Sequence, residues 1–246
     1  MAMKIGILLC DDFYPEAIEQ FGHHDDAFKN IFNSDTEIKY QTWRCHVGDF
    51  PEQVDECDAW VISGSKWSVY EQIPWMKKLI YFIQQLNNAE KALVGICFGH
   101  QLIHEALGGK VNKSPRGWGL GLYPIEVKHN YQNLKTGEYL NLIAMHQDQV
   151  ERIAPEFKSV AGSDFCPHAI TIKDSHILTL QSHPEFKANF FIQLCERVRE
   201  NAGNEMVNQA QQQVTEEGEG DRKRMTQTIQ QFVYSHKSND IKAKLQ

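Results

Sequence analysis

Residues 92–101 read ALVGICFGHQ, and this stretch decides the fold that we expect for the chain. Its first five residues are apolar, which is typical of a strand buried on both faces of a sheet. Apolar residues at helical spacing follow directly and stop at the glycine pair 108–109. A strand that runs straight into a helix indicates the β-α-β units of a parallel sheet.

Strand and helix patterns alternate on both sides of this stretch. Apolar or alternating runs predict strands at 4–10, 37–45 and 58–63, and helical spacing predicts helices at 16–32, 75–86 and 187–199. With right-handed crossovers, this order builds a doubly wound α/β sheet with helices on both faces. Between residues 119 and 180 the runs become short and alternating, which predicts further, partly antiparallel strands.

The composition changes near residue 201. Residues 209–221 (QAQQQVTEEGEGD) are polar, acidic and interrupted by glycine, which predicts a solvated linker. Large apolar residues then recur at helical spacing, at Met225, Ile229, Phe232 and Val233. We expect an α/β domain over 1–200 and an extension over 201–246, whose helix docks on the domain or on a second subunit, away from Cys97.

Composition and charge exclude several classes of protein. Hydrophobic residues make up 41% of the chain and charged residues 23%, as in folded proteins. The formal net charge is -7 and no basic stripe is present, so nucleic acid is not an expected partner. No apolar run suits a membrane helix or a signal peptide. The 6 cysteines form no C-x-x-C pair, so we expect neither disulfides nor structural zinc, and a cytoplasmic location.

Cys97 has the setting of a catalytic nucleophile. It stands between Gly95 and Gly99 where the buried strand turns into the helix. This G-x-C-x-G pattern allows a sharp turn that projects the central side chain above the sheet. The helix N-terminus favours the thiolate form. The other cysteines lack this context, and a cysteine in an apolar segment is ordinarily inert.

A base for this nucleophile is predicted at His183. The segment QSHPE over 181–185 follows an apolar run. In an extended segment residues two apart point the same way, so His183 and Glu185 share a face. Cys97, His183 and Glu185 therefore make a reasonable Cys-His-Glu triad.

Three other patterns are less specific. His100 and His104 have the spacing of a zincin helix, but the essential glutamate is missing. Residues 23–26 (HHDD) could bind a metal, although a solvated helix face is the better interpretation. Trp118 lies in a glycine-rich stretch and is interpreted as a turn and packing residue.

Four motifs together resemble the class I glutamine amidotransferase family. They are, in chain order, SGSKWSVYE (63–71), GICFGHQ (95–101), MHQDQV (145–150) and QSHPEF (181–186). The chain is most similar to stand-alone members related to the glutaminase domain of GMP synthetase, a group that includes γ-glutamyl peptidases. The resemblance covers residues 4–199. It implies a flavodoxin-like core, a triad at the carboxyl ends of the strands, and no metal or organic cofactor.

The resemblance assigns catalytic roles by motif. Cys97 would be the nucleophile, His183 the base and then the acid, and Glu185 its orienting carboxylate. The oxyanion hole would use the backbone N–H groups of Phe98 and Ser65. The loop departs from the family's Gly-Gly-Pro, because serine and lysine stand where the family has its second glycine and its proline.

The resemblance also implies which residues meet the substrate. The glutamyl amino and carboxylate groups would be held by the segments that contain Gly64, Gln101, His146, Gln147 and Asp148. Trp67 and Tyr70, on the loop beside the predicted oxyanion donor, are expected to face the substrate.

The expected reaction is hydrolysis of a γ-glutamyl amide, either glutamine or another γ-glutamyl compound, through a glutamyl thioester. One alternative is a glutaminase subunit that delivers ammonia to a synthetase, which would be a separate chain because no ATP-binding motif is present. A second is a non-catalytic interaction protein on the same fold, disfavoured because all three triad positions are present. An unrelated cysteine hydrolase would not be expected to carry His-Pro-Glu.

Overall fold

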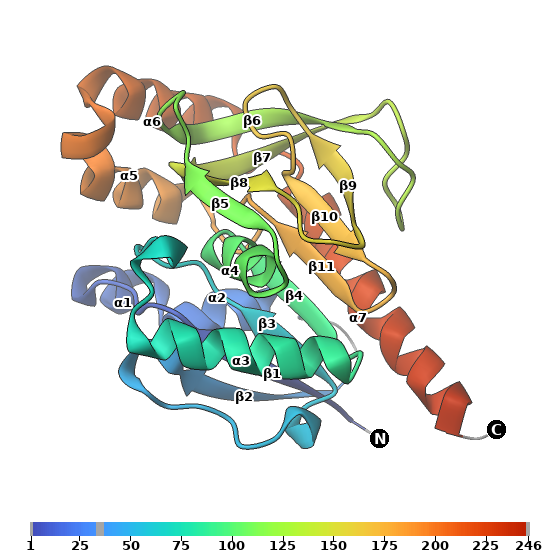
Figure 1. The fold of residues 1–246 in the computed structure, drawn as a ribbon. Helices are drawn as coiled ribbons and strands as arrows, with labels where there is room; N and C mark the ends of the chain where they lie inside the picture. Colours follow the sequence, from blue (N-terminus) through green and yellow to red (C-terminus); the bar gives the residue numbers. More distant parts are fainter. Residues whose placement is uncertain (1, 33–36, 245–246) are drawn as a thin grey trace.

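The computed structural model describes residues 2–32 and 37–244, and within them the main sheet has nine strands in the order β2-β1-β3-β4-β11-β10-β9-β6-β7 (Figure 1). Its strands are β1 (Met3–Leu9), β2 (Ile38–Arg44), β3 (Ala59–Ile62), β4 (Ala92–Ile96), β6 (Gly119–Val127), β7 (Tyr139–His146), β9 (Phe157–Gly162), β10 (Ile170–Lys173) and β11 (Ile177–Leu180). A separate antiparallel pair consists of β5 (Lys110–Lys113) and β8 (Asp148–Arg152).

The sheet is parallel in one half and antiparallel in the other. Strands β2, β1, β3, β4 and β11 run parallel, whereas β10, β9, β6 and β7 pair antiparallel. In the register of β4 and β11, Ile96 lies opposite Leu180. The two strands therefore end side by side, and the residues that follow them, Cys97 and the segment 181–185, meet at the carboxyl edge of the sheet. The expected doubly wound α/β fold is confirmed.

Helices cover both faces of the sheet (Figure 1). They are α1 (Pro15–Phe21), α2 (His24–Ile31), α3 (Pro74–Asn88), α4 (Phe98–Ala106), α5 (Ala188–Ala202), α6 (Asn204–Glu217) and α7 (Arg222–Lys244), with short 3₁₀ turns at η1 (Cys45–Val47), η2 (Val54–Glu56) and η3 (Val69–Glu71). Among the described residues, no helix combines the length and the apolarity that crossing a membrane would require.

Alternate residues of the central strands feed two separate cores. On β1 and β3, Leu8 and Ile62 pack in the cluster that contains the buried side chains of α3 and α4. Their neighbours Ile7 and Val61 point to the other face and pack in the cluster formed with α2 and α7. Both faces of these strands are buried, which explains why their sequences are continuous apolar runs.

The single helix expected over 16–32 is two helices. Gly22 ends α1 with a φ of 82°, a conformation that favours glycine, and α2 starts two residues later. The break turns the chain, so that α2 packs under the sheet through Phe28 while α1 packs in a third cluster with α5 and α6.

The linker expected over 209–221 is wrong, because α6 occupies most of it. Val207, Ala210 and Val214 are buried on one face of α6, and the glutamines and glutamates between them cost a helix little. Only the turn at 218–221, with glycine at two positions, remains of the expected linker.

The docked helix at the end of the chain is confirmed as α7. Its stripe of large apolar residues is buried in the same cluster as the central strands, at Met225, Ile229, Phe232 and Val233. The helix is longer than the stripe indicates and runs from Arg222 to Lys244. The division into domains at residue 200 stays a prediction.

Candidate active site

Cys97 lies at a sharp turn between β4 and α4. It caps α4 with a φ of 50° and a ψ of -102°, a conformation that a side chain rarely adopts. A Cβ on Gly95 would lie 2.8 Å from the backbone carbonyl of Gly99, and a Cβ on Gly99 would lie 2.4 Å from the carbonyl oxygen of Ile62. Both glycines are therefore required for the close approach of backbone to backbone that makes this turn.

His183 and Glu185 lie beside this turn. The Nδ1 of His183 is 2.6 Å from Glu185 Oε1, and both residues are buried. The imidazole stacks on Phe186 at a centroid distance of 4.1 Å. A Cβ on Gly64 would lie 3.1 Å from His183 Cε1 and 3.7 Å from Cys97 Cβ, so the imidazole and the cysteine approach the same small residue.

The charge of His183 is set by these neighbours. Burial alone would lower the pKa of the imidazole, but the Glu185 carboxylate and the Cys97 side chain outweigh burial and raise the pKa of His183 to about 10. Because a carboxylate accepts from Nδ1–H, Nε2 is the nitrogen left to exchange a proton elsewhere. At neutral pH this geometry favours a charged imidazolium.

We expect the histidine titration to report this arrangement. Glu185→Gln removes a negative charge beside the imidazolium, so the pKa of His183 should fall below its wild-type value of about 10. NMR titration of protein with ¹⁵N-labelled histidine measures both values, with a His183→Ala sample to assign the resonance. A wild-type titration near the ordinary histidine pKa of about 6.5 would contradict the ion pair.

Gln181 is a site residue that the motif analysis did not single out. Its Nε2 donates toward Cys97 Sγ at 3.6 Å, and its Oε1 accepts from Gln101 Nε2 at 3.1 Å. Gln101 Nε2 also donates to the carbonyl oxygen of Asp148 at 2.9 Å. An amide donor aimed at the sulfur stabilises a thiolate. The only signal in the sequence was its place at the head of the QSHPEF motif.

The loop after β3 is fixed by side-chain hydrogen bonds. Ser65 Oγ donates to the carbonyl oxygen of Cys10 at 2.9 Å and accepts from Trp67 N at 3.3 Å. Lys66 N donates to Asp11 Oδ2 at 3.2 Å. Within the described part of the chain, the Ser65 N–H itself donates to no acceptor. The candidate oxyanion donor is therefore free to bond a substrate oxygen.

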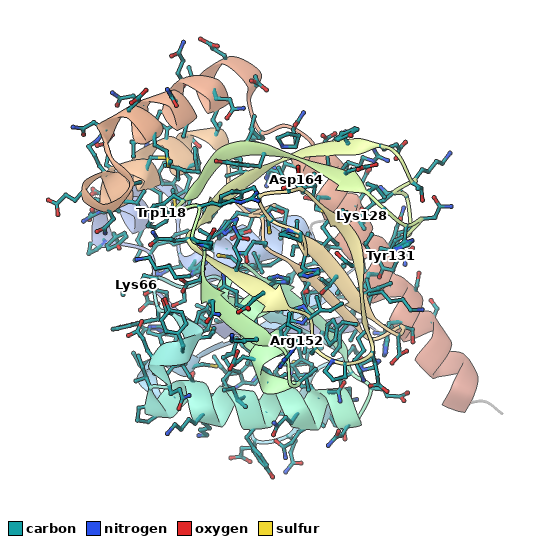
Figure 2. All side chains as sticks on the ribbon, turned by 45° about the horizontal axis from the view of Figure 1, so that its top comes forward. Lys66, Trp118, Lys128, Tyr131, Arg152 and Asp164 are labelled. Carbon is teal, nitrogen blue, oxygen red and sulfur yellow. The ribbon has the colours of Figure 1, made fainter. Side chains whose placement is uncertain are left out.

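A cavity of about 470 Å³ opens above Cys97. The sequence-predicted residues that line it are Gly64, Ser65, Trp67, Tyr70, Cys97, Gln101, His146, Gln147, Asp148 and His183. Glu185 lies behind His183 and does not line it, and the ring of Phe98 is buried against Trp75 at 5.7 Å. Lys66 and Trp118 lie on the same side of the molecule and both line the cavity (Figure 2). Trp118, which we interpreted as a turn and packing residue, thus also borders this space.

Asp148 connects the two sides of the cavity mouth. Its carboxylate accepts from Ser68 Oγ at 2.5 Å and from the hydroxyl of Tyr70 at 3.0 Å, and its carbonyl oxygen lies 3.1 Å from His146 Nδ1. Burial lowers the pKa of His146 to about 4, although the hydrogen bond to Asp148 opposes the shift. His146 is therefore a neutral positioning group for this corner at physiological pH.

Of the two remaining histidine patterns, the one at 23–26 differs from expectation. His24 does not lie on a solvated helix face: it is 6% exposed and lines the cavity. Among the described residues, no group of three His, Cys, Asp or Glu side chains could hold a metal. His100 and His104 are buried and bond Thr179 Oγ1 at 2.7 Å and Thr171 Oγ1 at 2.9 Å, which ties α4 to the sheet.

The other cysteines are protected. All six cysteines are free and buried. Burial raises the pKa of Cys57, Cys166 and Cys195 to about 12, and it also raises the pKa of Cys10 and Cys45. These thiols are therefore poor nucleophiles at neutral pH.

Comparison with known proteins agrees with this geometry. The family model "Glutamine amidotransferase class-I" matches residues 19–193. Gamma-glutamyl peptidase 2 of Arabidopsis thaliana is 29% identical over 188 residues, 73% of this chain and 75% of the relative. The glutamine-hydrolyzing GMP synthase of Caldanaerobacter subterraneus subsp. tengcongensis is 31% identical over 161 residues, 59% of this chain and 30% of the synthase.

The fold has solved counterparts as well. The crystal structure of a glutamine amido transferase from Methylobacillus flagellatus superimposes with a TM-score of 0.75 over 96% of both chains, at 19% identity. The protein described here belongs to the class I glutamine amidotransferase family.

Proposed function

We propose that the protein is an enzyme that hydrolyses a γ-glutamyl amide through a thioester on Cys97. One observation carries the proposal: Cys97 stands strained at the end of β4 beside an imidazole that Glu185 holds at 2.6 Å, at the floor of a cavity. A thiol, a proton carrier and an orienting carboxylate in that order are what covalent acyl transfer needs. The family membership supports the same class of reaction.

The reaction would proceed in two steps. The Cys97 thiolate bonds to the γ-carbonyl carbon, and the negative oxygen accepts from the N–H groups of Phe98 and Ser65. The carbon–nitrogen bond then breaks as the imidazolium of His183 gives its proton to the departing amine. In the second step His183 takes a proton from water, and the resulting hydroxide attacks the thioester carbon. The carbon–sulfur bond breaks, glutamate leaves, and the Cys97 side chain is free again.

The glutamyl end of the substrate would bind near Gln101 and Asp148. Both donor bonds of the Gln101 amide go to protein oxygens, those of Asp148 and Gln181, so its own oxygen remains to accept from an α-ammonium group. Gln147 and His146 line the same corner, and Gly64 leaves space beside Cys97. We assign this corner to the α-amino and α-carboxylate groups.

The test is a screen of the purified protein against glutamine and a panel of γ-glutamyl amides, with release of glutamate and of the amine measured separately. Release of both products at equal rates supports the hydrolase. The GMP synthase relative motivates one alternative, delivery of ammonia to a separate synthetase chain. That alternative requires glutamine to be the best substrate of the panel. Absence of glutamate release from every compound would reject both.

We expect Cys97 to be the first cysteine to react with iodoacetamide at pH 7. It alone combines a helix N-terminus, a neighbouring imidazolium and the amide of Gln181, whereas burial raises the pKa of the other thiols. Peptide mapping after brief treatment measures the order of labelling, and a Cys97→Ser sample gives the background. First labelling at Cys166 or Cys195 would contradict the assignment.

A further inference from the structure

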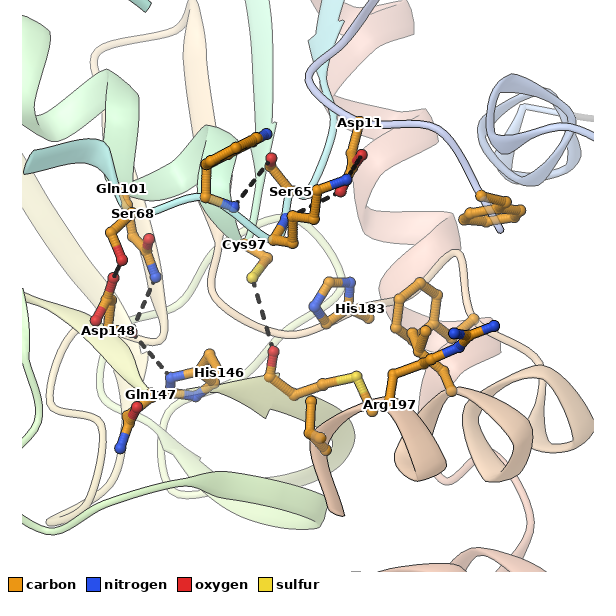
Figure 3. A pocket seen from close by; sticks show the side chains of 18 of the residues that line it. Asp11, Ser65, Ser68, Cys97, Gln101, His146, Gln147, Asp148, His183 and Arg197 are labelled. Atoms are coloured by element: carbon orange, nitrogen blue, oxygen red, sulfur yellow. Dashed lines mark hydrogen bonds and ion pairs between the residues drawn. The ribbon is translucent and has the colours of Figure 1, made fainter. Parts of the chain in front are cut away.

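The cavity extends past the candidate triad on the side where a leaving amine must sit. Figure 3 shows Gln101, Gln147 and Asp148 on one side of Cys97, with His183 and Arg197 on the other. Because His183 protonates the departing nitrogen, the leaving amine lies on the His183 side. Ammonia would fill almost none of this space.

The walls of this side are aromatic. Rings follow one another from the triad imidazole to a second imidazole: His183 to Phe186 at 4.1 Å, Phe186 to Phe190 at 4.8 Å, Phe190 to Phe13 at 4.4 Å and Phe13 to His24 at 4.3 Å between centroids. We call Phe13, Phe186 and Phe190 the aromatic wall, and all three line the cavity. Burial of an apolar group of the substrate against these rings would stabilise the complex.

His24, at the end of the aromatic wall, presents an unused acceptor. Its Nδ1 lies 2.9 Å from the carbonyl oxygen of Asp11, and because a carbonyl can only accept, Nδ1 carries the hydrogen. Nε2 therefore carries the lone pair, and it has no partner among the described residues. The residue is 94% buried but still lines the cavity, so Nε2 is free to accept a hydrogen bond from an occupant. Burial lowers the pKa of His24, which keeps the ring neutral.

Two cations that line the cavity, Lys66 and Arg197, are already paired. Lys66 Nζ lies 2.8 Å from Asp11 Oδ1, and Arg197 pairs with Glu16 while it lies over the ring of Tyr14 at 4.0 Å. A leaving amine with a free carboxylate would have to compete with these acidic partners. The region therefore suits a neutral apolar group with a hydrogen-bond donor better than an anion.

We propose that this end of the cavity is a leaving-group subsite, in which the aromatic wall holds an apolar or aromatic body and His24 Nε2 accepts a hydrogen bond from a neutral donor on it. The inference rests on the proposed function and narrows its substrate class. The preferred substrates are γ-glutamyl amides of bulky amines that carry an amide or hydroxyl donor, in place of glutamine. His24 thereby becomes a residue that determines specificity.

Two matched substrates test the subsite. γ-Glutamyl-phenylalaninamide carries a ring and a carboxamide donor, whereas γ-glutamyl-phenethylamide carries the ring alone. In the wild type we expect kcat/KM for both to exceed that for glutamine by at least about tenfold, because the ring is buried on the aromatic wall. The donor should give the phenylalaninamide a further advantage of about fivefold over the phenethylamide.

Three variants then locate the acceptor through the ratio of the two kcat/KM values, which does not depend on the amount of active protein. His24→Asn keeps an amide near the position of Nδ1 but has no atom at Nε2, so the ratio should fall to about one. His24→Gln places an amide oxygen near Nε2 and should retain most of the ratio. His23→Asn, a change at the exposed neighbour, should leave it unaltered.

The outcomes separate this inference from the proposed function. If glutamine and the amides are cleaved but the wild-type ratio is about one, the subsite is wrong and the hydrolase stands. The role of Nε2 is overturned if His24→Asn keeps the wild-type ratio of the two kcat/KM values. It is also overturned if His24→Gln loses that ratio as completely as His24→Asn does. If Cys97 supports cleavage of none of the compounds, both proposals fall.

Discussion

Cys97→Ser should lower kcat/KM for every γ-glutamyl substrate by at least about 10⁴-fold. The substitution nearly keeps the size of the side chain but replaces the sulfur nucleophile by a hydroxyl, which is a much weaker nucleophile. The remaining groups of the site can bind and polarise the substrate, but no covalent intermediate forms. Steady-state kinetics on the best substrate of the panel measure the effect. Mass spectrometry should detect a glutamyl adduct on the wild type and none on the variant.

A paired control shows that the loss is chemical. Cys97 is buried, and its sulfur lies 3.6 Å from Gln181 Nε2 and 4.0 Å from the Met145 carbonyl oxygen, beside the imidazole of His183, all groups that a serine hydroxyl can also meet. The melting temperature of Cys97→Ser should therefore stay close to that of the wild type. A serine variant that keeps a tenth or more of the wild-type activity would end the thioester mechanism.

Removal of residues 222–246 should leave a chain that does not fold stably. The four large apolar side chains of α7, Met225, Ile229, Phe232 and Val233, are 0–2% exposed. Full burial of each contributes about 1.5–3 kcal/mol to the free energy of unfolding, so their joint loss is about 6–12 kcal/mol. That amount rivals the whole stability of a typical domain, about 5–15 kcal/mol. Circular dichroism and thermal melting of the truncated chain measure it.

Point variants of α7 make the prediction sharper. Phe232→Ala should lower the free energy of unfolding by about 3–5 kcal/mol, because it opens a cavity under the sheet. Gln231→Ala, at the exposed neighbour, should change it by less than about 0.5 kcal/mol. No described residue of α7 lines the cavity, so folded Phe232→Ala should keep the wild-type kcat/KM. A truncated chain that melts like the full one would show that α7 is dispensable.

The fold was predictable where one physical cause dominated the sequence. The strand at 92–96 was predicted with the same bounds as β4. A strand buried on both faces is apolar at every position, so its ends are easy to recognise in the sequence. The error at 209–221 has the opposite origin. Three small apolar residues at Val207, Ala210 and Val214 fix α6, and their signal was diluted by the polar, helix-compatible residues around them.

The candidate site was predictable only where motifs exist. Cys97 and His183 were named from glycine spacing and from the His-Pro-Glu segment, and β-strand register brings these segments together. Their catalytic roles stay proposals. His24 carried no such signal, because its meaning depends on the Asp11 carbonyl and on the rings of Phe13 and Phe190. Contacts between distant parts of the chain leave no periodic trace in a single sequence.

Asp11 has a consequence for anyone who wishes to redesign the enzyme. Its carbonyl holds His24 and its carboxylate holds the backbone and the ammonium of Lys66, so a single residue anchors both the proposed acceptor and the loop beside Cys97. A change that displaces Asp11 would alter recognition and turnover together. Leu194 and Val198, which line the cavity from α5 without a bond to Asp11, are the positions at which substrate range can be altered one property at a time.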